Sequence, residues 1–384
     1  MKKSTSILTI AFCFISINVL SQNKSDNFGK LLIKGQLSGW EHFNASNTYP
    51  LWSGARYIPQ ANYEIDLGEN RLIDFETSAN IYGNFGFKSF NSTSTNGDLK
   101  PYRFWGRYST QQFEFRVGLQ KINFGSASLL RPLMWFDQID PRDPLQLTDG
   151  VWGALARYYF LNNTNVWLWG LYGNNNKKGW ESAASLKNKP EFGGRIQIPV
   201  SKGEAALSFH HRKADYTFLE DEIFALETAE NRIGFDTKLD LAVGLWMETS
   251  WVNSREDIGI FTNQEIINLG IDYTFRLGNG LTVIYEQLIV AYNEKAFVFD
   301  QTLIFSLLNM TYPIGLFDNL SAIVYYDWTN KSAYNFINWQ KQFNNISLFI
   351  MGYVNPKNYN IPTQGATEML FAGSGIQLML VFNH

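Results

Sequence analysis

The chain has 384 residues, of which 45% are hydrophobic, 16% aromatic and 17% charged. Its apolar content and its formal net charge of −3 exclude an intrinsically disordered chain. The near balance of 32 basic and 35 acidic residues gives no electrostatic reason to expect nucleic acid as a partner, so the class must come from the residue pattern.

The first residues have the pattern of a secretory signal peptide. Two lysines precede an apolar stretch from Ile7 to Leu20, and Ser21 fits the position before a cleavage site. The stretch is too short for a membrane anchor, and it contains the only cysteine, so the exported protein would have no disulfide. We therefore predict a signal peptide over residues 1–21 and one domain over residues 22–384.

Apolar and polar residues alternate along most of the remaining chain. The first strand is expected to begin by about Lys30, and the alternation is clearest over residues 73–82, 113–120, 191–198 and 266–276. A period of two predicts β-strands, and strands of about ten residues exceed the roughly five or six that are usual in ordinary sheets. About ten tilted residues cross the hydrocarbon layer of a bilayer, where an open sheet edge is not tolerated.

Short turns alternate with mostly longer connections. The short turns are expected near residues 68–70, 109–111, 162–164, 201–203, 238–240, 278–280, 313–315 and 344–345. The longer connections are expected near residues 43–54, 87–100, 122–149, 174–189, 215–230, 254–263, 293–297, 329–333 and 355–367.

These connections predict an all-β fold: a transmembrane, antiparallel up-and-down β-barrel of about eighteen strands with both termini in the periplasm. Sixteen strands are the alternative, because residues 293–335 are poorly patterned. A secreted soluble β protein is the competing fold, and it would have shorter strands.

Charged residues on the polar strand faces fall into two groups. The first group is basic and contains Arg103, Arg107, Arg116, Arg157, Arg195, Arg212 and Arg232. The second group follows it in the chain and contains Glu248, Asp272, Glu286, Asp300 and Asp327. A basic wall opposite an acidic one would set ion preference in a pore. Alternatively, the basic group is neutralised by salt bridges to Glu114, Glu191, Glu204 and Asp236, and both interpretations stay open.

The third long connection, residues 122–149, is apolar where an exposed loop would be polar. It contains Leu129, Leu130, Leu133, Met134, Trp135, Phe136 and Ile139. We expect the loop to fold into the barrel and narrow it, whereas the alternative is a loop packed over the rim. The predicted pore constriction consists of Arg103, Arg107, Arg116 and Arg157 from the strands, facing Arg131, Asp137, Asp140, Arg142 and Asp143 from the loop.

The stretch Gly118–Gly125, GLQKINFG, resembles a strand-end motif of porin-like families, including phosphate-selective and alginate-export types. The signal peptide and the composition rich in Asn, Phe and Tyr are similar to those of Bacteroidetes outer-membrane porin-like proteins. The resemblance implies passive passage of small hydrophilic solutes or ions through the outer membrane, without a cofactor, and it allows a homotrimer. A phosphate channel would be expected to have a lysine-rich constriction, which residues 122–149 lack.

The last strand, with Phe382 close to the end, resembles the signal that barrel-assembly machinery recognises in its clients. Two other classes of function stay open: a structural or assembly barrel with an occluded lumen, and an outer-membrane hydrolase. For the hydrolase, Ser208 and His210 share a strand face, but same-face neighbours are about 7 Å apart, beyond hydrogen-bond reach. His210 and His211 point to opposite faces and could not share a metal ion, so we expect neither an enzyme nor a metal site.

Overall fold

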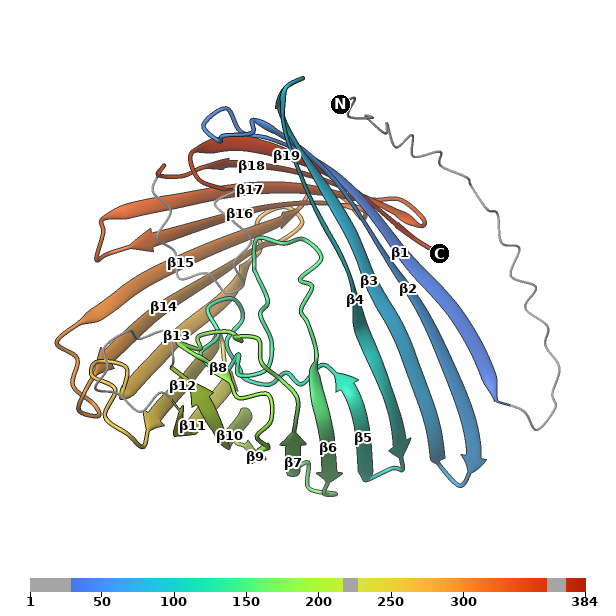
Figure 1. Cartoon of the computed structure of the whole chain (residues 1–384), viewed down its shortest axis with the longest axis vertical. Coiled ribbons are helices and arrows are strands. Elements are labelled where there is room, and N and C mark those ends of the chain that lie inside the picture. The colour runs from blue at the N-terminus through green and yellow to red at the C-terminus, as the bar shows by residue number, and fades with distance from the viewer. Residues whose placement is uncertain (1–28, 217–226, 358–370) are drawn as a thin grey trace, which may run out of the picture.

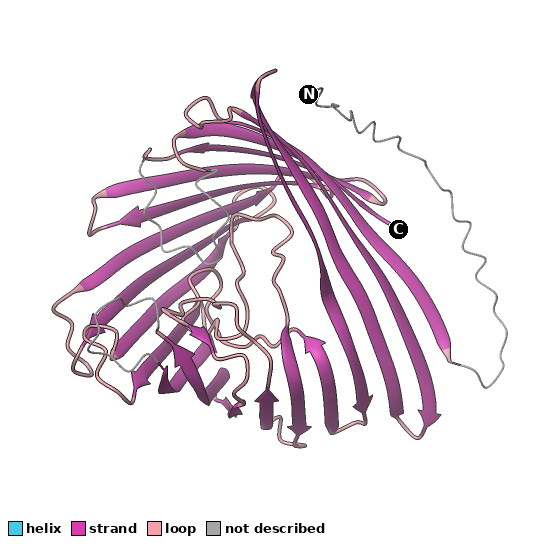
Figure 2. Cartoon of the chain, viewed as in Figure 1, coloured by secondary structure: helices cyan, strands magenta, loops and turns pink. Residues whose placement is uncertain are grey.

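The computed structural model describes residues 29–216, 227–357 and 371–384. These residues form one closed antiparallel barrel, in which each strand pairs with its neighbours and the first strand pairs with the last (Figure 1). Figure 2 shows strands joined by loops around the whole described chain. No helix in the described ranges is long and apolar enough to cross a membrane. The predicted all-β antiparallel barrel of eighteen strands is confirmed.

Strand lengths differ strongly around the first half of the barrel. The strands β2 to β4 have 18, 19 and 18 residues, whereas β5 to β7 have 8, 9 and 7. The strands of this half are β1 (Lys30–Phe43), β2 (Leu51–Gly68), β3 (Arg71–Ser89), β4 (Ser92–Ser109), β5 (Phe113–Gln120), β6 (Val151–Tyr159), β7 (Asn165–Leu171) and β9 (Glu191–Val200). A two-residue strand, β8 (Ala184–Ser185), lies in the connection after β7 and pairs with β10.

The second half of the barrel has strands of more even length. They are β10 (Gly203–Asp215), β11 (Glu227–Asp240), β12 (Gly244–Ser254), β13 (Asn263–Phe275), β14 (Leu281–Asn293), β15 (Thr302–Pro313), β16 (Asp318–Asp327), β17 (Ser332–Gln342), β18 (Ile346–Val354) and β19 (Ser374–Asn383). The turn expected at residues 238–240 lies just after β11 instead. Asp300, expected on a strand, lies in the connection before β15.

The long connection predicted at residues 87–100 is wrong. β3 and β4 continue as a paired ribbon to Ser89 and Ser92, and residues 92–100 belong to β4 (Figure 1). Asn96 and Gly97 have low strand propensity and serine is common in turns, but each of residues 92–97 is paired with a residue of β3. Pairing with the neighbouring strand therefore overrides the local preference for a loop.

The alternation along each strand separates two environments. In β10, Leu207 and Phe209 point outward and are 53% and 42% exposed, whereas Ser208 and His210 point inward and are 1% and 0% exposed. An outer face of exposed apolar side chains suits contact with lipid. The period of two therefore reflects an apolar exterior and a separate interior.

The inner face of β13–β18 is itself largely apolar. Its buried side chains form a cluster with Leu130, and they are Ile266, Leu288, Val290, Phe305, Leu307, Tyr325, Tyr334, Phe336, Met351 and Tyr353. In β15, Ile304 and Leu308 lie on the face opposite to Phe305 and Leu307, so both faces are apolar. Residues 293–335 are poorly patterned for this reason.

The residues after Phe382 continue the seam that closes the barrel. The N–H of Gly35 donates to the carbonyl of His384 at 2.9 Å, and the N–H of His384 donates back to Gly35 at 3.0 Å. The His384 ring stacks on the Tyr57 ring at 6.0 Å between centroids. The two C-terminal residues therefore extend the pairing of β19 with β1.

Candidate pore lumen

The connection between β5 and β6, residues 121–150, is here called the inner loop. It has no regular secondary structure, so its buried backbone N–H groups need other acceptors. Glu286 of β14 supplies one acceptor group: the N–H groups of Ser128, Leu129 and Leu130 donate to its carboxylate at 2.8, 3.2 and 2.6 Å. Three consecutive amides thus surround one buried carboxylate.

Two further carboxylates hold the inner loop against the same wall. The N–H groups of Ala127 and Leu133 each donate to Glu248 of β12 at 2.7 Å. The hydroxyl of Ser126 donates to Asp236 of β11 at 2.9 Å. The side chains of Glu248 and Glu286 are fully buried, so the acidic residues of this wall serve as acceptors for the loop.

Apolar packing fixes the middle of the inner loop. Leu133, Trp135 and Phe136 are 2 to 3% exposed and pack with Trp169 of β7 and other side chains of β6 and β7. The indole N–H of Trp135 donates to the hydroxyl of Ser250 at 3.0 Å. The loop therefore contacts β6 and β7 on one side and β12 and β14 on the other.

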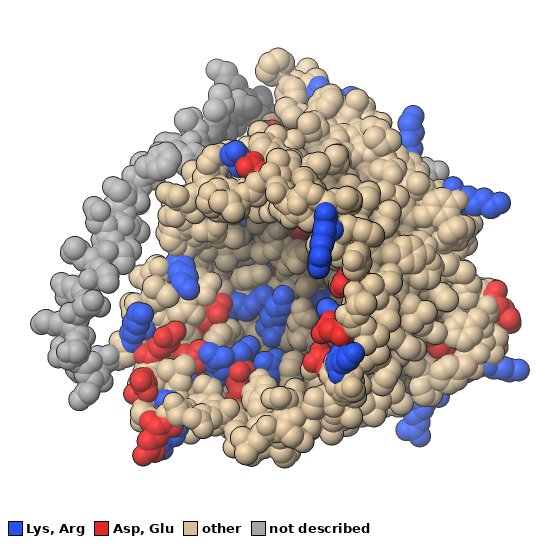
Figure 3. Space-filling model, turned by 180° about the vertical axis from the view of Figure 1, so that it is seen from behind, with Lys and Arg blue, Asp and Glu red and all other residues tan. Residues whose placement is uncertain are grey.

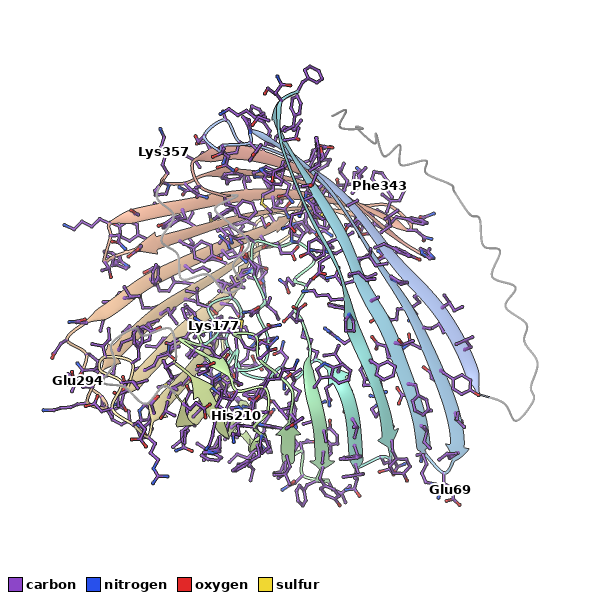
Figure 4. The ribbon with its side chains drawn as sticks, viewed as in Figure 1. Glu69, Lys177, His210, Glu294, Phe343 and Lys357 are labelled. Carbon is purple, nitrogen blue, oxygen red and sulfur yellow. The ribbon has the colours of Figure 1, made fainter. Side chains whose placement is uncertain are left out.

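The connection between β7 and β9 forms a second layer on the inner loop. The N–H of Gly179 donates to the carbonyl of Asp137 at 3.0 Å, and the indole N–H of Trp180 donates to the carbonyl of Arg131 at 2.8 Å. Glu181 pairs with two strand arginines, as described next. Figure 4 shows Lys177 and His210 within the outline of the barrel, whereas Glu69 and Phe343 lie at short turns on the rim.

A fully buried ion cluster anchors that second layer. Glu181 pairs with Arg212 at 3.0 Å and with Arg232 at 2.8 Å. Glu230 pairs with the same two arginines at 2.6 and 2.7 Å. Because all four side chains are at most 5% exposed, these arginines are neutralised and do not present free charge to the lumen.

The structure brings three of the predicted wall arginines together. Arg107 donates two hydrogen bonds to Asp74, at 2.9 and 2.8 Å, and one to Glu114 at 3.4 Å. Arg116 and Arg157 pair with Glu114 at 3.0 and 3.5 Å. The salt-bridged interpretation therefore describes this part of the wall.

Aromatic rings flank these arginines. The guanidinium groups of Arg116 and Arg107 lie 4.6 and 5.5 Å from the centroid of Trp105, and that of Arg157 lies 3.8 Å from Trp167. The fourth predicted arginine, Arg103, donates to the carbonyl of Thr148 at 3.0 Å and so ties the end of the inner loop to β4.

The charged residues of the inner loop pair with each other. Arg131 pairs with Asp137 at 3.2 Å, and Arg142 donates to Asp140 at 2.7 Å. Burial raises the pKa of Asp137, and the charge and hydrogen bond of Arg131 oppose that rise. Asp137 and Asp140 thus each have an arginine partner within six residues in the same loop.

Asp143 has backbone partners instead. Its carboxylate accepts the N–H groups of Leu145 at 2.9 Å and Leu147 at 3.4 Å. Burial raises the pKa of Asp143, while these hydrogen bonds and the charge of Arg56 oppose the rise. The cation that acts on this aspartate is therefore Arg56 of β2, which the sequence did not single out.

Arg56 was missed because the residues before it were assigned to a connection over 43–54. The structure places it in β2, where its guanidinium lies 5.5 Å from the centroid of Trp40 and 5.4 Å from that of Tyr82. The available signal was the alternation of Trp52, Gly54 and Arg56 with Ser53 and Ala55.

The histidine considered for a hydrolase has other partners. His210 Nδ1 accepts the indole N–H of Trp169 at 3.1 Å, and its Nε2 lies 3.2 Å from a carboxylate oxygen of Glu191. Ser208 accepts a hydrogen bond from Arg195 at 3.1 Å and is 1% exposed. In the described part of the chain, no three His, Cys, Asp or Glu residues are grouped to hold a metal ion.

Figure 3 shows a hollow in which Lys and Arg side chains lie beside Asp and Glu side chains. The part of the wall that carries Arg107, Arg116 and Arg157 is only partly buried, with side-chain exposures of 26%, 15% and 16%. The charged, partly exposed wall therefore lies on β4–β6, away from the wall of β12 and β14 that holds the inner loop.

The fold is similar to that of solved outer-membrane porins. The Acinetobacter baumannii protein OccAB4 matches with a TM-score of 0.56 and 10% identity, over 94% of this chain and 99% of that one. An anion-selective porin from Comamonas acidovorans gives a TM-score of 0.48 and 13% identity, over 93% of this chain and 100% of that one. No protein-family model and no curated protein matches the sequence. The chain has the fold of an outer-membrane porin.

Proposed function

We propose that the protein is an outer-membrane, porin-like channel for passive diffusion of small hydrophilic solutes or ions. The observation that carries the proposal is the division of side chains between an apolar exterior and a charged interior, as in β10, together with a loop held inside the barrel. Polar wall residues would let water and solutes pass, and the inner loop would narrow the path. No cofactor takes part.

In this proposal the constriction lies between the inner loop and the wall of β1–β6. Its residues are those predicted from the sequence: Arg103, Arg107, Arg116, Arg157, Arg131, Asp137, Asp140, Arg142 and Asp143. The ion pairs around Glu114 and within the loop support a constriction whose charges are largely balanced. The size of a solute would then limit its passage more strongly than its charge.

The proposal includes a location and partners. Residues 1–21, which lie outside the described residues, would be removed as a signal peptide on export. The barrel would sit in outer-membrane lipid with both termini in the periplasm, and β19 would present Phe382 to the barrel-assembly machinery. A homotrimer is the assembly we would test first, and a Bacteroidetes origin is consistent with the composition.

A recording of the purified full-length barrel in planar lipid bilayers tests the proposal. Discrete steps of conductance are expected for a channel. Silence, with barrel folding verified by heat-dependent mobility in detergent gels, would contradict it.

One observation favours a second candidate, a structural barrel with an occluded lumen. Leu133, Met134 and Trp135 of the inner loop are 1 to 3% exposed, so much of the barrel interior is filled by protein. The same recording separates the two functions, because an occluded barrel conducts no ions. Parallel assays for lipid or peptide hydrolysis test the remaining alternative.

A further inference from the structure

Arg56 differs from the other arginines of the lumen. Its guanidinium lies between the rings of Trp40 on β1 and Tyr82 on β3, 5.5 and 5.4 Å from their centroids. Within the described residues it has neither a salt bridge nor a hydrogen bond, its Nε is buried without a partner, and the acid on which its charge acts is Asp143. Aromatic rings hold a guanidinium in place without cancelling its charge.

The backbone next to Arg56 is shaped for this arrangement. Trp40 pairs with Gly54 across β1 and β2, and a Cβ on Gly54 would lie only 2.2 Å from the Trp40 ring. The missing side chain leaves room for the indole over β2, where its ring lies 5.5 Å from the guanidinium of Arg56. Gly54 is therefore a positioning residue for Arg56.

The inner loop approaches this cation. Leu145 of the loop packs in the cluster that contains Trp40. Asp143, the nearby acid, has its carboxylate bound to two backbone N–H groups, and Arg142 is paired with Asp140. Lys100, on β4, is paired with Asp149 at 2.7 Å. These groups thus have closer partners than Arg56. Asp98 of β4, in register with Tyr82, is exposed and has no salt bridge within the described residues, and Asp143 is the acid on which the charge of Arg56 acts, so that charge is only partly balanced.

We propose that Arg56 gives the lumen a preference for anions. The two rings hold its positive charge in place where the inner loop comes close to β1–β3. The inference rests on the proposed channel function. An anion passing this level would meet the edge of the guanidinium and its N–H donors, whereas a cation would meet a positive charge that no salt bridge neutralises. The paired arginines Arg107, Arg116 and Arg157 contribute less, since each shares its charge with Asp74 or Glu114.

Reversal potentials of single channels in a potassium chloride gradient test the inference. Arg56→Gln is expected to lower the anion-to-cation permeability ratio by about threefold, whereas Arg56→Lys keeps the charge and most of the ratio. The matched control is Glu69→Gln with Arg71→Gln, which removes a neutral, exposed pair at the β2–β3 end of the wall and is expected to leave the ratio unchanged. Gly54→Ala should shift the Trp40 ring and lower the ratio part of the way.

The outcomes separate the two proposals. A conducting Arg56→Gln channel with an unchanged ratio overturns the role of Arg56 and leaves the channel function standing. An equal fall in the neutral-pair control also overturns it, because the ratio would then depend on any change to the wall. A native protein that never conducts overturns the channel and this inference together. Folding of each variant is checked by heat-dependent mobility in detergent gels.

Discussion

The walls formed by β1–β6 and by β12–β18 have different roles, although both consist of strands with alternating side chains. On β4–β6, inward side chains are arginines, acids and tryptophans that remain partly exposed. On β12–β18, many inward side chains are buried carboxylates and apolar groups, which are packed against Leu129 and Leu130 of the inner loop and against Trp180 and Phe371. An inward position therefore does not mean contact with water, because protein covers one wall and leaves the other open.

The two walls also use charge differently. Glu248 and Glu286 accept backbone N–H groups and so satisfy a loop that has no secondary structure of its own. Glu114 instead joins three arginines of neighbouring strands. The first arrangement stabilises a loop position, and the second stabilises a charged wall. The predictions below separate these roles.

The largest effect is expected from shortening the inner loop between Leu129 and Asp143. The change removes Trp135 and Phe136, which fill the space between the two walls. If the loop sets the bottleneck, single-channel conductance should rise about twofold or more, as a wider pore passes more ions. Conductance equal to that of the native protein would show that the bottleneck lies elsewhere.

Removing one member of the buried ion cluster should cost the most stability. Arg212→Ala leaves Glu230 and Glu181 partly unpaired in the interior and is expected to lower the free energy of unfolding by about 3–5 kcal/mol. Arg71→Ala, at an exposed pair with Glu69, should cost about 0.5 kcal/mol or less. Urea unfolding in detergent micelles measures the free energy of unfolding of both variants. An equal decrease in the two variants would contradict the assigned difference in burial.

Loosening the inner loop should change the current without widening the pore permanently. Glu248→Gln with Glu286→Gln replaces two acceptors by amides, which can accept fewer of the five loop N–H groups. Open-channel current noise should increase because the loop would leave its position more often. Glu294→Gln, at an exposed residue after β14, is the control, and noise that rises equally in both would argue against these anchors.

The smallest effect concerns pH. Burial raises the pKa of Asp143, so the folded protein binds the proton more tightly than the unfolded chain does. Stability contributed by this group is therefore greatest at low pH and decreases as the pH rises from the unfolded pKa through the raised folded pKa. Asp143→Asn should remove that part of the pH dependence in urea unfolding. An identical pH profile in the variant would show that another group is responsible.

Local pattern in the sequence was enough for several features of the fold. Alternation is a property of neighbouring residues, so strands such as β5 and β10 could be recognised, and turns with Gly and Asn marked most strand ends. A sheet that spans lipid must be closed, and the number of predicted connections gave the count of eighteen strands. The prediction of a loop at residues 87–100 failed because pairing with β3 holds this segment as a strand. The Asn, Ser and Gly residues of β4 would not favour a strand by themselves.

The sequence by itself determined the class of the fold, the order of the strands and which residue types face inward, because those follow from a period of two and from the needs of a backbone in lipid. Only the tertiary structure decided that Glu286 holds amides 156 to 158 residues away, that Glu114 joins three arginines, and that Arg56 has rings for neighbours. These contacts join segments that are distant in the chain. Their partners are set by the curvature of the closed sheet and the path of the inner loop across it, which no local pattern encodes.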